Sequence, residues 1–570
     1  MNRRILTALL GLGAFGAAVY SRRRRLMRHA LDLPPVNCGV EVRRGLRVTM
    51  SDGVALACDH YQPAAPGAHP TILIRTPYSR GGLTGTMTAW TAQRFAERGY
   101  HVIVQDVRGR FDSEGEFEPF VHEASDGRQT VDWILSQPWC NGVIGLWGQS
   151  YAGFAQWATV SQSPAGVRAI FPMLTRSNFN PFSENGIMLD TLLRWIVILH
   201  TLDSDRLPAW KKALRILWPP EQEKLLARGF DHLPLATIDQ AVFGYPIELY
   251  RNWIRQFYPG STYWQRADMS PMLTELETPV HLVGGWYDIF IADQLADYAA
   301  LRQAGRRPYL TVGPWHHLHP ETRGASVRLA LDWFDFHLKD GKRPLRPTPV
   351  RIYLMGADQW RDLPDWPPPA KHWSYYLQPD GQLARQKPPT GADPDRYLYN
   401  PADPTPNVGG PLLSSDAGPT DNRNLEARPD VLTYTTEPLD QDVDVIGPVQ
   451  LLLYVRSNRP HTSFFGRLCD VHPDGRSINI CDGMARIGPN QEVHQPDGSR
   501  RLEIKLTPTA QRFLQGHRIR LQVSSGAHPR YARHLNTGEL GTRAIDMVVA
   551  EQTVYHDANH PAALILPVAT

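Results

Sequence analysis

The feature that most constrains the fold is an alternation of short apolar strands with helix-like segments that starts near residue 40. Strands are predicted at 70–78, 101–109, 142–148 and 167–174, with helical patterns between them. Strands that alternate with helices in this way form a mainly parallel sheet covered on both faces. The preceding stretch, 46–63, instead predicts a hairpin around Ser51-Asp52-Gly53. The chain therefore begins its folded part as an α/β domain.

The alternation is interrupted between residues 176 and 275, which are rich in helix formers and bulky aromatics such as Trp195 and Trp253. It resumes over 276–345. We expect one α/β domain built from 36–175 and 276–345, with 176–275 inserted as a helical cap. Such an insertion would cover the carboxyl ends of the strands, where ligands bind in open α/β sheets.

The sequence pattern changes again after residue 345, where loops rich in Pro, Gly and Asp separate segments in which apolar and polar residues alternate. Leu502, Ile504 and Leu506 share one face of such a segment. A chain of 570 residues also exceeds what one hydrophobic core usually serves. We predict that residues 346–570 form a separate all-β sandwich of jelly-roll type.

Residues 1–35 stand apart from these domains. Their apolar run, residues 5–20, is bounded by arginines on both sides and is shorter than the roughly 20 residues that span a bilayer. We predict a membrane-associated segment, with the enzyme on the cytoplasmic side because of the flanking arginines. A cleaved signal peptide and an exported protein, or a misassigned start, are the alternatives.

Composition excludes several classes of protein. The net charge of +3 is small and its basic excess lies near the N-terminus, so a nucleic-acid partner is not expected. The five cysteines form no CxxC pair, which argues against a disulfide scaffold or a zinc ribbon. No phosphate-binding loop or dinucleotide fingerprint occurs, so we expect no cofactor and no metal. The oligomeric state stays open.

The stretch GLWGQSYAGFAQW, residues 145–157, places Ser150 at a predicted junction from strand to helix. A nucleophile elbow occupies this position in α/β enzymes, because the sharp turn exposes the serine hydroxyl above the sheet. The turn demands small neighbours, and Gly148, Ala152 and Gly153 meet that demand. A structural serine in a tight turn is the alternative.

A nucleophilic serine needs a base and an orienting carboxylate, which follow in the order Ser, Asp, His in hydrolases of this architecture. Asp288 comes just after the predicted strand at 279–285, and His316, His317 and His319 come after the next one at 307–313. Neighbouring histidines can also bind zinc, but no clustered acidic partner or HExxH accompanies them. Order, position and residue type predict a triad.

Two donors are needed to stabilise the oxyanion. The backbone N–H of Tyr151, directly after the nucleophile, is the first. The hydroxyl of Tyr78, in the loop after an early strand, is a candidate for the second, with a packed aromatic as the alternative. Asp106, Arg108 and Asp112 lie in a polar loop, for which an ion-pair network is favoured over substrate contact.

These residues carry a resemblance to a known family. The motifs RTPY, QDVRGRFDSEGEF, GQSYAG, GGWYD and GPWHH, with IGPVQLLLYV, DVHPDG and PRYARHLNTG later on, make the chain similar to the X-Pro dipeptidyl-peptidase/cocaine-esterase (CocE/NonD) family. The resemblance spans about residue 40 to the C-terminus and implies an α/β hydrolase fold with a helical cap and a C-terminal jelly roll.

The resemblance implies that Ser150 is the nucleophile, Asp288 the acid and His317 the base. The family commonly has G-P-W-S-H, so His316 stands here where relatives carry a serine. Tyr78 matches the tyrosine that donates its hydroxyl to the oxyanion.

The expected function is hydrolysis of acyl or aryl carboxylic esters through an acyl-enzyme. Amino-acid ester hydrolases of the family carry acidic residues after the triad aspartate, whereas Ile289, Phe290 and Ile291 follow Asp288 here. This departure favours an uncharged small-molecule ester. An X-Pro dipeptidyl-peptidase or amide acylase with the same triad is the nearest alternative. A non-catalytic carbohydrate- or lipid-binding protein is the second.

Overall fold

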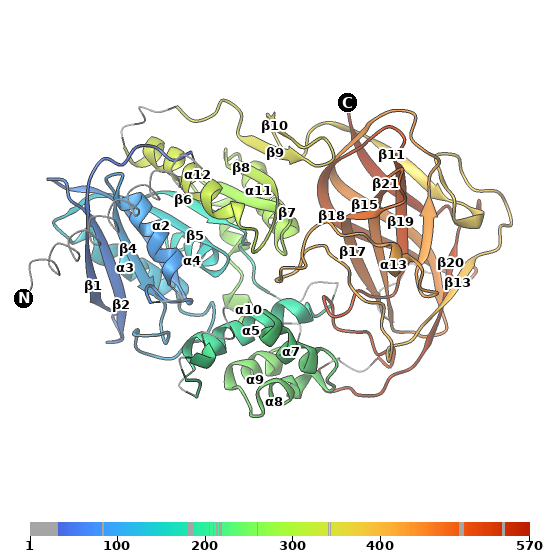
Figure 1. Cartoon of the computed structure of the whole chain (residues 1–570), viewed down its shortest axis with the longest axis horizontal. Helices are drawn as coiled ribbons and strands as arrows, with labels where there is room; N and C mark the ends of the chain where they lie inside the picture. The colour runs from blue at the N-terminus through green and yellow to red at the C-terminus, as the bar shows by residue number, and fades with distance from the viewer. Residues whose placement is uncertain are drawn as a thin grey trace, which may run out of the picture.

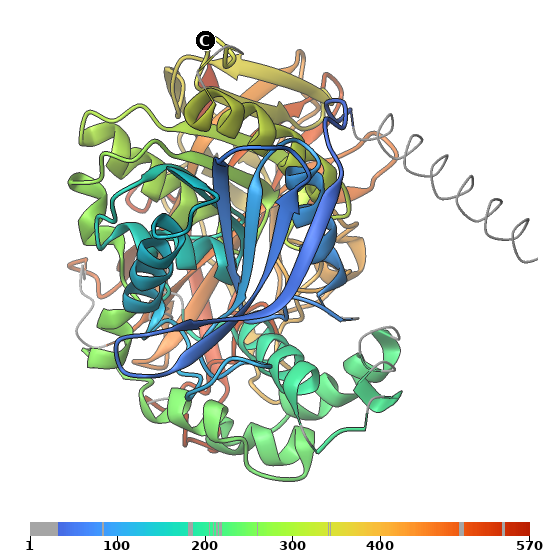
Figure 2. The same cartoon turned by 90° about the vertical axis from the view of Figure 1, so that its left-hand side faces the viewer.

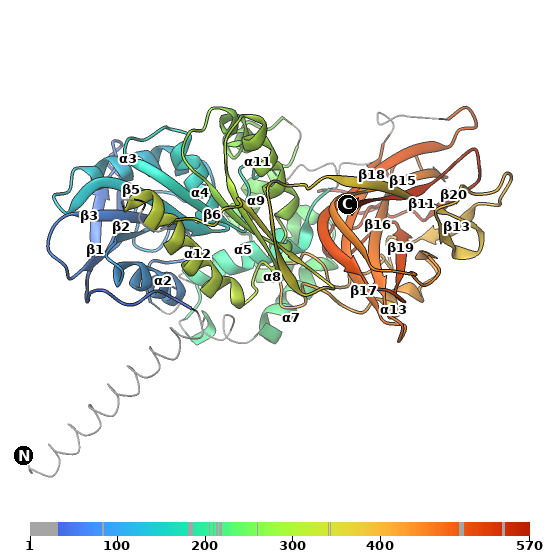
Figure 3. The ribbon, with the colours of Figure 1, turned by 90° about the horizontal axis from the view of Figure 1, so that it is seen from above.

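The computed structural model describes residues 32–570 except 83–84, 181–185, 205, 209, 213–214, 216–218, 259, 340, 342–343, 489–494 and 539–541. Figure 1 shows an α/β part, a group of helices below it, and a β part beside it. Seen from above, the α/β and β parts again lie side by side (Figure 3). The predicted membrane-associated residues 5–20 lie outside the described residues. From residue 32 onward, the described helices include none that is both long and apolar enough to cross a membrane.

A ten-stranded sheet forms the centre of the α/β part, in the order β1-β2-β4-β3-β5-β6-β7-β8-β9-β10. Its strands are β1 (Val40–Thr49), β2 (Ala55–Pro63), β3 (His69–Thr76), β4 (His101–Asp106), β5 (Cys140–Gln149), β6 (Val167–Met173), β7 (His281–Tyr287), β8 (Tyr309–His316), β9 (Val350–Leu354) and β10 (Gln359–Leu363). The run from β4 through β3 to β9 is parallel, and antiparallel strands lie at both edges. The predicted hairpin is thus confirmed as β1 and β2.

Helices cover both faces of this sheet (Figure 2). Two helices, α2 (Thr86–Ala96) and α12 (Glu321–Leu338), pack on one face, and α3 (Glu123–Leu135), α4 (Tyr151–Val160) and α11 (Ile291–Gln303) cover the other. The apolar core on the α2 face includes Phe95, Trp147 and Phe334. The core on the other face continues into the β part. This two-sided burial explains why the parallel strands are apolar throughout.

The α/β sheet continues past residue 345, where the sequence pattern predicts its end. Strand β9 pairs in parallel with β8, and β10 pairs with β9 as an antiparallel edge. The last two strands of the sheet therefore lie at 350–363, after residue 345. Their burial pattern alternates, unlike that of the central strands, which is why the sequence groups them with the all-β region.

The elements described between β6 and β7 are helices joined by loops. They are α5 (Leu189–Asp203), α7 (Pro219–Phe230), α8 (Ile238–Phe243), α9 (Glu248–Arg255) and α10 (Thr262–Arg266), with short 3₁₀ turns at Leu235–Thr237 and Ser270–Thr274. These helices share a core of their own that includes Leu193, Ile238 and Tyr250. Figures 1 and 2 show them gathered on one side of the α/β part.

The β part contains two sheets whose side chains form one core. The first holds β11 (Ala370–Leu377), β12 (Leu383–Ala384), β13 (Asp395–Tyr399), β15 (Val443–Ser457), β18 (Arg500–Phe513), β20 (Ala550–Tyr555) and β21 (Ala563–Ala569). The second holds β14 (Leu432–Thr435), β16 (Thr462–Val471), β17 (Ser477–Ile487) and β19 (Arg518–Ser524), with one short helix, α13 (Arg423–Glu426), between β13 and β14. The jelly-roll connectivity stays a prediction.

Candidate active site

Ser150 lies at the junction between β5 and α4, in a backbone conformation that few residues adopt. Its φ is 58° and its ψ is −123°, a strained combination outside the ordinary regions. The turn is held from below, since the Ser150 N–H donates to the Met173 carbonyl at 2.9 Å and Thr175 Oγ1 donates to the Ser150 carbonyl at 2.8 Å. This is the geometry of a nucleophile elbow.

Two glycines beside the serine are required by close packing. A Cβ at Gly148 would lie 2.4 Å from the Ala152 carbonyl oxygen. A Cβ at Gly153 would lie 2.5 Å from Cγ2 of Thr175. Real Cβ contacts are not this short, so the sharp turn admits no side chain at either position. The small residues noted in the sequence are explained by the turn itself.

Asp288 and His317 meet at the carboxyl ends of β7 and β8. His317 Nδ1 lies 2.6 Å from Asp288 Oδ2, and both side chains are buried, at 4% and 1% exposed. The second oxygen of Asp288 accepts the backbone N–H of Phe290 at 2.9 Å. The carboxylate is therefore fixed from two sides and holds Nδ1 as the protonated nitrogen, which leaves Nε2 free to accept a proton.

The fold brings Ser150 and His317 to one cavity. The strand order reverses at β3 and β5, the switch point where α/β sheets bind ligands, and Ser150 follows β5 directly. Gln149 Nε2 donates to the His317 carbonyl at 2.9 Å, which ties the histidine loop to the end of β5. Ser150, His317 and Tyr78 line the same cavity of about 410 Å³.

Tyr78 lies just beyond β3 and its hydroxyl contacts a residue of the insertion. Trp195 Nε1 donates to the Tyr78 hydroxyl oxygen at 2.9 Å. Burial raises the pKa of Tyr78, against the lowering effect of hydrogen bonds with Trp195 and Ser150. Because the indole fills an acceptor position, the phenolic proton is free to be donated toward the serine side. The sequence pattern gave Trp195 no role beyond packing in the cap.

Tyr151 is the first residue of α4, and N–H groups in a first helical turn have no intrahelical acceptor. The side chain of Tyr151 takes no part in the predicted oxyanion contact, which involves only the backbone N–H. The phenol donates to Glu123 Oε1 at 2.8 Å and accepts the Phe120 N–H at 3.0 Å. Burial raises the pKa of both Tyr151 and Glu123, and the charge of Arg75 opposes the rise for Glu123. The ring therefore anchors the start of α4 to Glu123 and to the backbone of Phe120.

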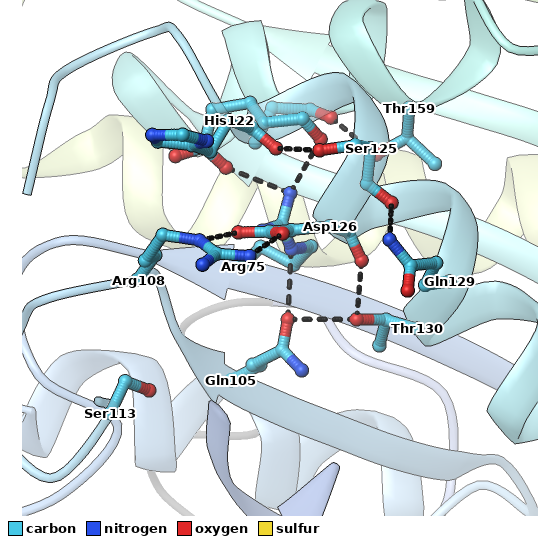
Figure 4. A network of polar contacts seen from close by, with 12 residues as sticks. Arg75, Gln105, Arg108, Ser113, His122, Ser125, Asp126, Gln129, Thr130 and Thr159 are labelled. Carbon is cyan, nitrogen blue, oxygen red and sulfur yellow. Dashed lines mark hydrogen bonds and ion pairs between the residues drawn. The ribbon is translucent and has the colours of Figure 1, made fainter. Parts of the chain in front are cut away.

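A buried polar network supports this anchor from below (Figure 4). Arg75 contacts Glu123 Oε2 at 2.7 Å and donates to Gln105 at 2.9 Å. Arg108 donates to both oxygens of Asp126, at 3.0 and 2.7 Å. The ion-pair interpretation of the polar loop is confirmed, since Arg80 pairs in the same way with Asp106 and Asp112.

The cavity walls are largely apolar, and ten of the lining residues are Phe, Trp or Tyr. Trp195 stacks on Trp253 with ring centroids 5.0 Å apart, and Phe120 stacks on Tyr151 at the same distance. The lining includes Phe257, Trp264, Ile289 and Phe290. Among the described lining residues none is Asp or Glu, and one, Arg176, carries a fixed positive charge.

One wall comes from the β part. Leu413, in the loop between β13 and β14, lines the cavity. Its N–H donates to Asp190 Oδ2 of α5 at 3.4 Å, while the Asp190 N–H donates to the Pro529 carbonyl at 3.0 Å. No sequence signal singled out Leu413, because it is an ordinary apolar residue 263 positions after Ser150.

The other two histidines of the HHLH stretch do not contact Asp288. The rings of His316 and His319 pack against each other with centroids 5.2 Å apart. Burial lowers the pKa of His316. His319 lines the rim of the cavity, whereas His317 alone pairs with the carboxylate.

Comparison with known proteins shows the family of the chain. Residues 52–319 match the family described as X-Pro dipeptidyl-peptidase (S15 family), and residues 345–565 match the X-Pro dipeptidyl-peptidase C-terminal non-catalytic domain. The chain is 34% identical to a cocaine esterase of Rhodococcus sp. (strain MB1 Bresler), in an alignment that covers 94% of this chain and 99% of the relative.

Solved structures show the same fold at lower identity. An aminopeptidase from a marine sediment Thaumarchaeota archaeon superposes with a TM-score of 0.78 at 23% identity, over 94% of this chain and 98% of that one. An α-amino acid ester hydrolase superposes with a TM-score of 0.75 at 21% identity and the same coverage. These likenesses extend through both the α/β and the β parts.

Proposed function

Because the chain belongs to the X-Pro dipeptidyl-peptidase (S15) family and is a serine hydrolase, we propose that it hydrolyses acyl or aryl carboxylic esters with Ser150 as nucleophile. Its substrate is a small molecule. Asp288 and His317 complete the triad, and Tyr78 with the N–H of Tyr151 forms the oxyanion hole. The segment 176–275 acts as a cap over the site, and the β part that follows β10 forms the jelly-roll domain.

In the proposed reaction, His317 Nε2 removes the proton from Ser150 Oγ as the oxygen attacks the ester carbonyl. The carbonyl oxygen becomes an oxyanion, which Tyr78 and the Tyr151 N–H stabilise. The intermediate collapses as the alcohol leaves with the proton from His317. Water then attacks the acyl-enzyme, giving a proton to His317. The second intermediate collapses as His317 returns that proton to Ser150 Oγ, which releases the acid and regenerates the enzyme. The short Nδ1 contact with Asp288 supports this role for the imidazole.

The observation that favours an ester over an X-Pro peptide is the charge of the cavity. An X-Pro dipeptidyl-peptidase must bind a free N-terminal ammonium, which calls for carboxylates or carbonyl oxygens in the site. None of the described residues that line the cavity is Asp or Glu. The resemblance to a protein named cocaine esterase also supports an ester as the substrate.

A direct comparison of substrates tests this proposal. We expect a 4-nitrophenyl acyl ester to be hydrolysed far faster than an X-Pro 4-nitroanilide, measured as kcat/KM on the purified full chain. Faster cleavage of the anilide would overturn the ester proposal in favour of the peptidase. Failure of the folded protein to react with a fluorophosphonate probe would instead favour a non-catalytic binding protein.

Removal of the Tyr78 hydroxyl tests the oxyanion hole. Tyr78→Phe keeps the ring in place but deletes one of two donors to the oxyanion. We expect kcat to fall by roughly 10²–10³, the scale for one lost oxyanion donor. The measurement is steady-state hydrolysis of a 4-nitrophenyl ester. Tyr263→Phe, which removes the hydroxyl of a half-buried tyrosine of the cap segment that donates to the Pro119 carbonyl, is the matched control and should leave kcat within a few-fold.

Trp195 is proposed as a positioning residue that acts through Tyr78. Trp195→Phe removes the indole donor but keeps an aromatic ring. We expect kcat to fall about 3–10-fold, the effect of one ordinary hydrogen bond. In the Tyr78→Phe background the same substitution should change kcat little, because its partner oxygen is already gone. Equal losses in both backgrounds would mean that Trp195 acts by packing alone.

A further inference from the structure

Arg176 stands out in the cavity because its surroundings are apolar. It follows β6 and is the one residue with a fixed positive charge among the described residues that line the cavity. Its side chain is 13% exposed. A guanidinium at such a site is costly unless its N–H groups find acceptors.

Not every N–H group of the Arg176 guanidinium has an acceptor among the described residues. One terminal nitrogen, Nη1, lies 2.8 Å from Asp293 Oδ2, on a carboxylate that is 48% exposed to solvent. The Nε atom is buried and has no hydrogen-bond partner among the described residues. An unsatisfied buried N–H loses its hydration without compensation. The guanidinium of Arg176, a residue that lines the cavity, therefore retains a donor that no described residue accepts.

The position of the guanidinium is set by two rings. Its central carbon lies 5.1 Å from the ring centroids of both Phe179 and Phe290. The Phe290 ring in turn lies edge-on to His317, with centroids 5.6 Å apart. The cation is thus separated from the base by a single aromatic ring, close enough to contact the same bound molecule.

Asp297, the other acidic residue near Arg176, is only a weak competitor of a substrate carboxylate for the guanidinium. Asp297, on the same helix as Asp293, accepts hydrogen bonds from the N–H and hydroxyl of Ser177, at 2.8 and 2.6 Å. Burial raises the pKa of Asp297 to about 7, so its negative charge is partly lost near neutral pH. Asp293 is left as the main counter-charge, and it contacts one edge of the guanidinium.

We propose that Arg176 binds a carboxylate carried by the ester substrate, so that the preferred substrates are esters with an anionic group in their acyl or alcohol part. This inference rests on the proposed esterase function. Arginine suits the task because its planar donors match a carboxylate and charge-assisted hydrogen bonds are strong. The apolar residues Ile289, Phe290 and Ile291 favoured an uncharged ester in the sequence analysis. Arg176 adds a cation to the lining of the cavity and favours an anionic ester instead.

The test compares esters that differ only in one charge. The first pair is mono-4-nitrophenyl adipate and its methyl-capped diester, with the carboxylate in the acyl part. The second pair is 5-acetoxy-2-nitrobenzoate and its methyl ester, with the carboxylate in the alcohol part. The readout is the ratio of kcat/KM for the charged over the capped ester, normalised to the fraction of enzyme that a fluorophosphonate labels.

We expect Arg176→Met to lower this ratio on the order of 10-fold or more in at least one pair, mainly through KM. Arg176→Lys keeps the charge and should retain part of the preference. Asp293→Asn removes the competing carboxylate and should raise the ratio several-fold. Arg128→Met, which removes an exposed arginine paired with Asp132 on α3, is the matched control and should leave the ratio unchanged.

The outcomes separate this inference from the proposed function. A ratio that is the same in wild type, Arg176→Met and Asp293→Asn, in an enzyme that still hydrolyses the capped esters, would overturn the role of Arg176 alone. If the wild type hydrolyses none of the four esters, the proposed function is overturned, and this inference with it. Opposite shifts of the ratio in Arg176→Met and Asp293→Asn would support it.

Discussion

Ser150→Ala is expected to lower kcat for a 4-nitrophenyl ester on the order of 10⁶-fold, the scale found when a triad serine is removed. The reason is that the substitution removes the oxygen that would form the acyl-enzyme, at the strained elbow between β5 and α4. The variant should also lose all labelling by a fluorophosphonate. Alanine fits the turn as serine does, since its neighbours already tolerate a Cβ at this position.

Ser161→Ala is the matched control for this substitution. Ser161 lies at the other end of α4 and its hydroxyl donates to the Ala158 carbonyl at 2.7 Å. Its loss should leave both turnover and labelling intact. Residual turnover by Ser150→Ala within 100-fold of wild type, with an unchanged unfolding midpoint, would mean that another group is the nucleophile.

Asp288→Asn is expected to lower kcat about 10⁴-fold, the loss seen when a triad aspartate becomes an amide. The asparagine can turn its NH₂ toward His317 Nδ1. That contact stabilises the tautomer with the proton on Nε2, which cannot accept the proton of Ser150. The present contact of 2.6 Å between Nδ1 and Oδ2 is the one that enforces the productive tautomer.

The measurement is kcat across a range of pH, with thermal unfolding recorded beside it. The Phe290 N–H can still be accepted by the amide oxygen of the variant, so the loop should keep its shape. Asp132→Asn, on the exposed face of α3, should have no effect. A loss below 10-fold would show that Asp288 neither orients nor stabilises the base.

The order of the chain was enough to predict where the residues of the proposed triad lie. Parallel strands all end at the same edge, so Ser150, Asp288 and the histidines of 316–319 could be assigned to one region from strand patterns. The choice of His317 among those histidines came from the family resemblance. The glycines beside Ser150 were also informative, because the steric demand of the elbow is local. These inferences need only the immediate neighbours of each residue.

Contacts made across the fold could not be predicted in this way. The hydrogen bond from Trp195 to Tyr78 joins residues 117 positions apart, and no periodicity marks an indole as a partner for a phenol. The same is true of Arg176, whose sequence neighbours suggest nothing about Asp293 or the ring of Phe290. Strands β9 and β10 join the first sheet because of their pairing with β8, which an alternating pattern does not specify.

The contacts of Asp190 have a consequence for exchanging parts between relatives. One of its oxygens accepts the N–H of Leu413 and its own N–H donates to Pro529, so α5 is bonded to two separate loops of the β part. If the helical segment alone is moved into a relative, α5 faces the loops of that relative in place of those that hold Leu413 and Pro529. Transplanting the helices with both loops preserves the shape of the cavity. Libraries that aim to change the acids this enzyme releases should therefore vary these three segments as one unit.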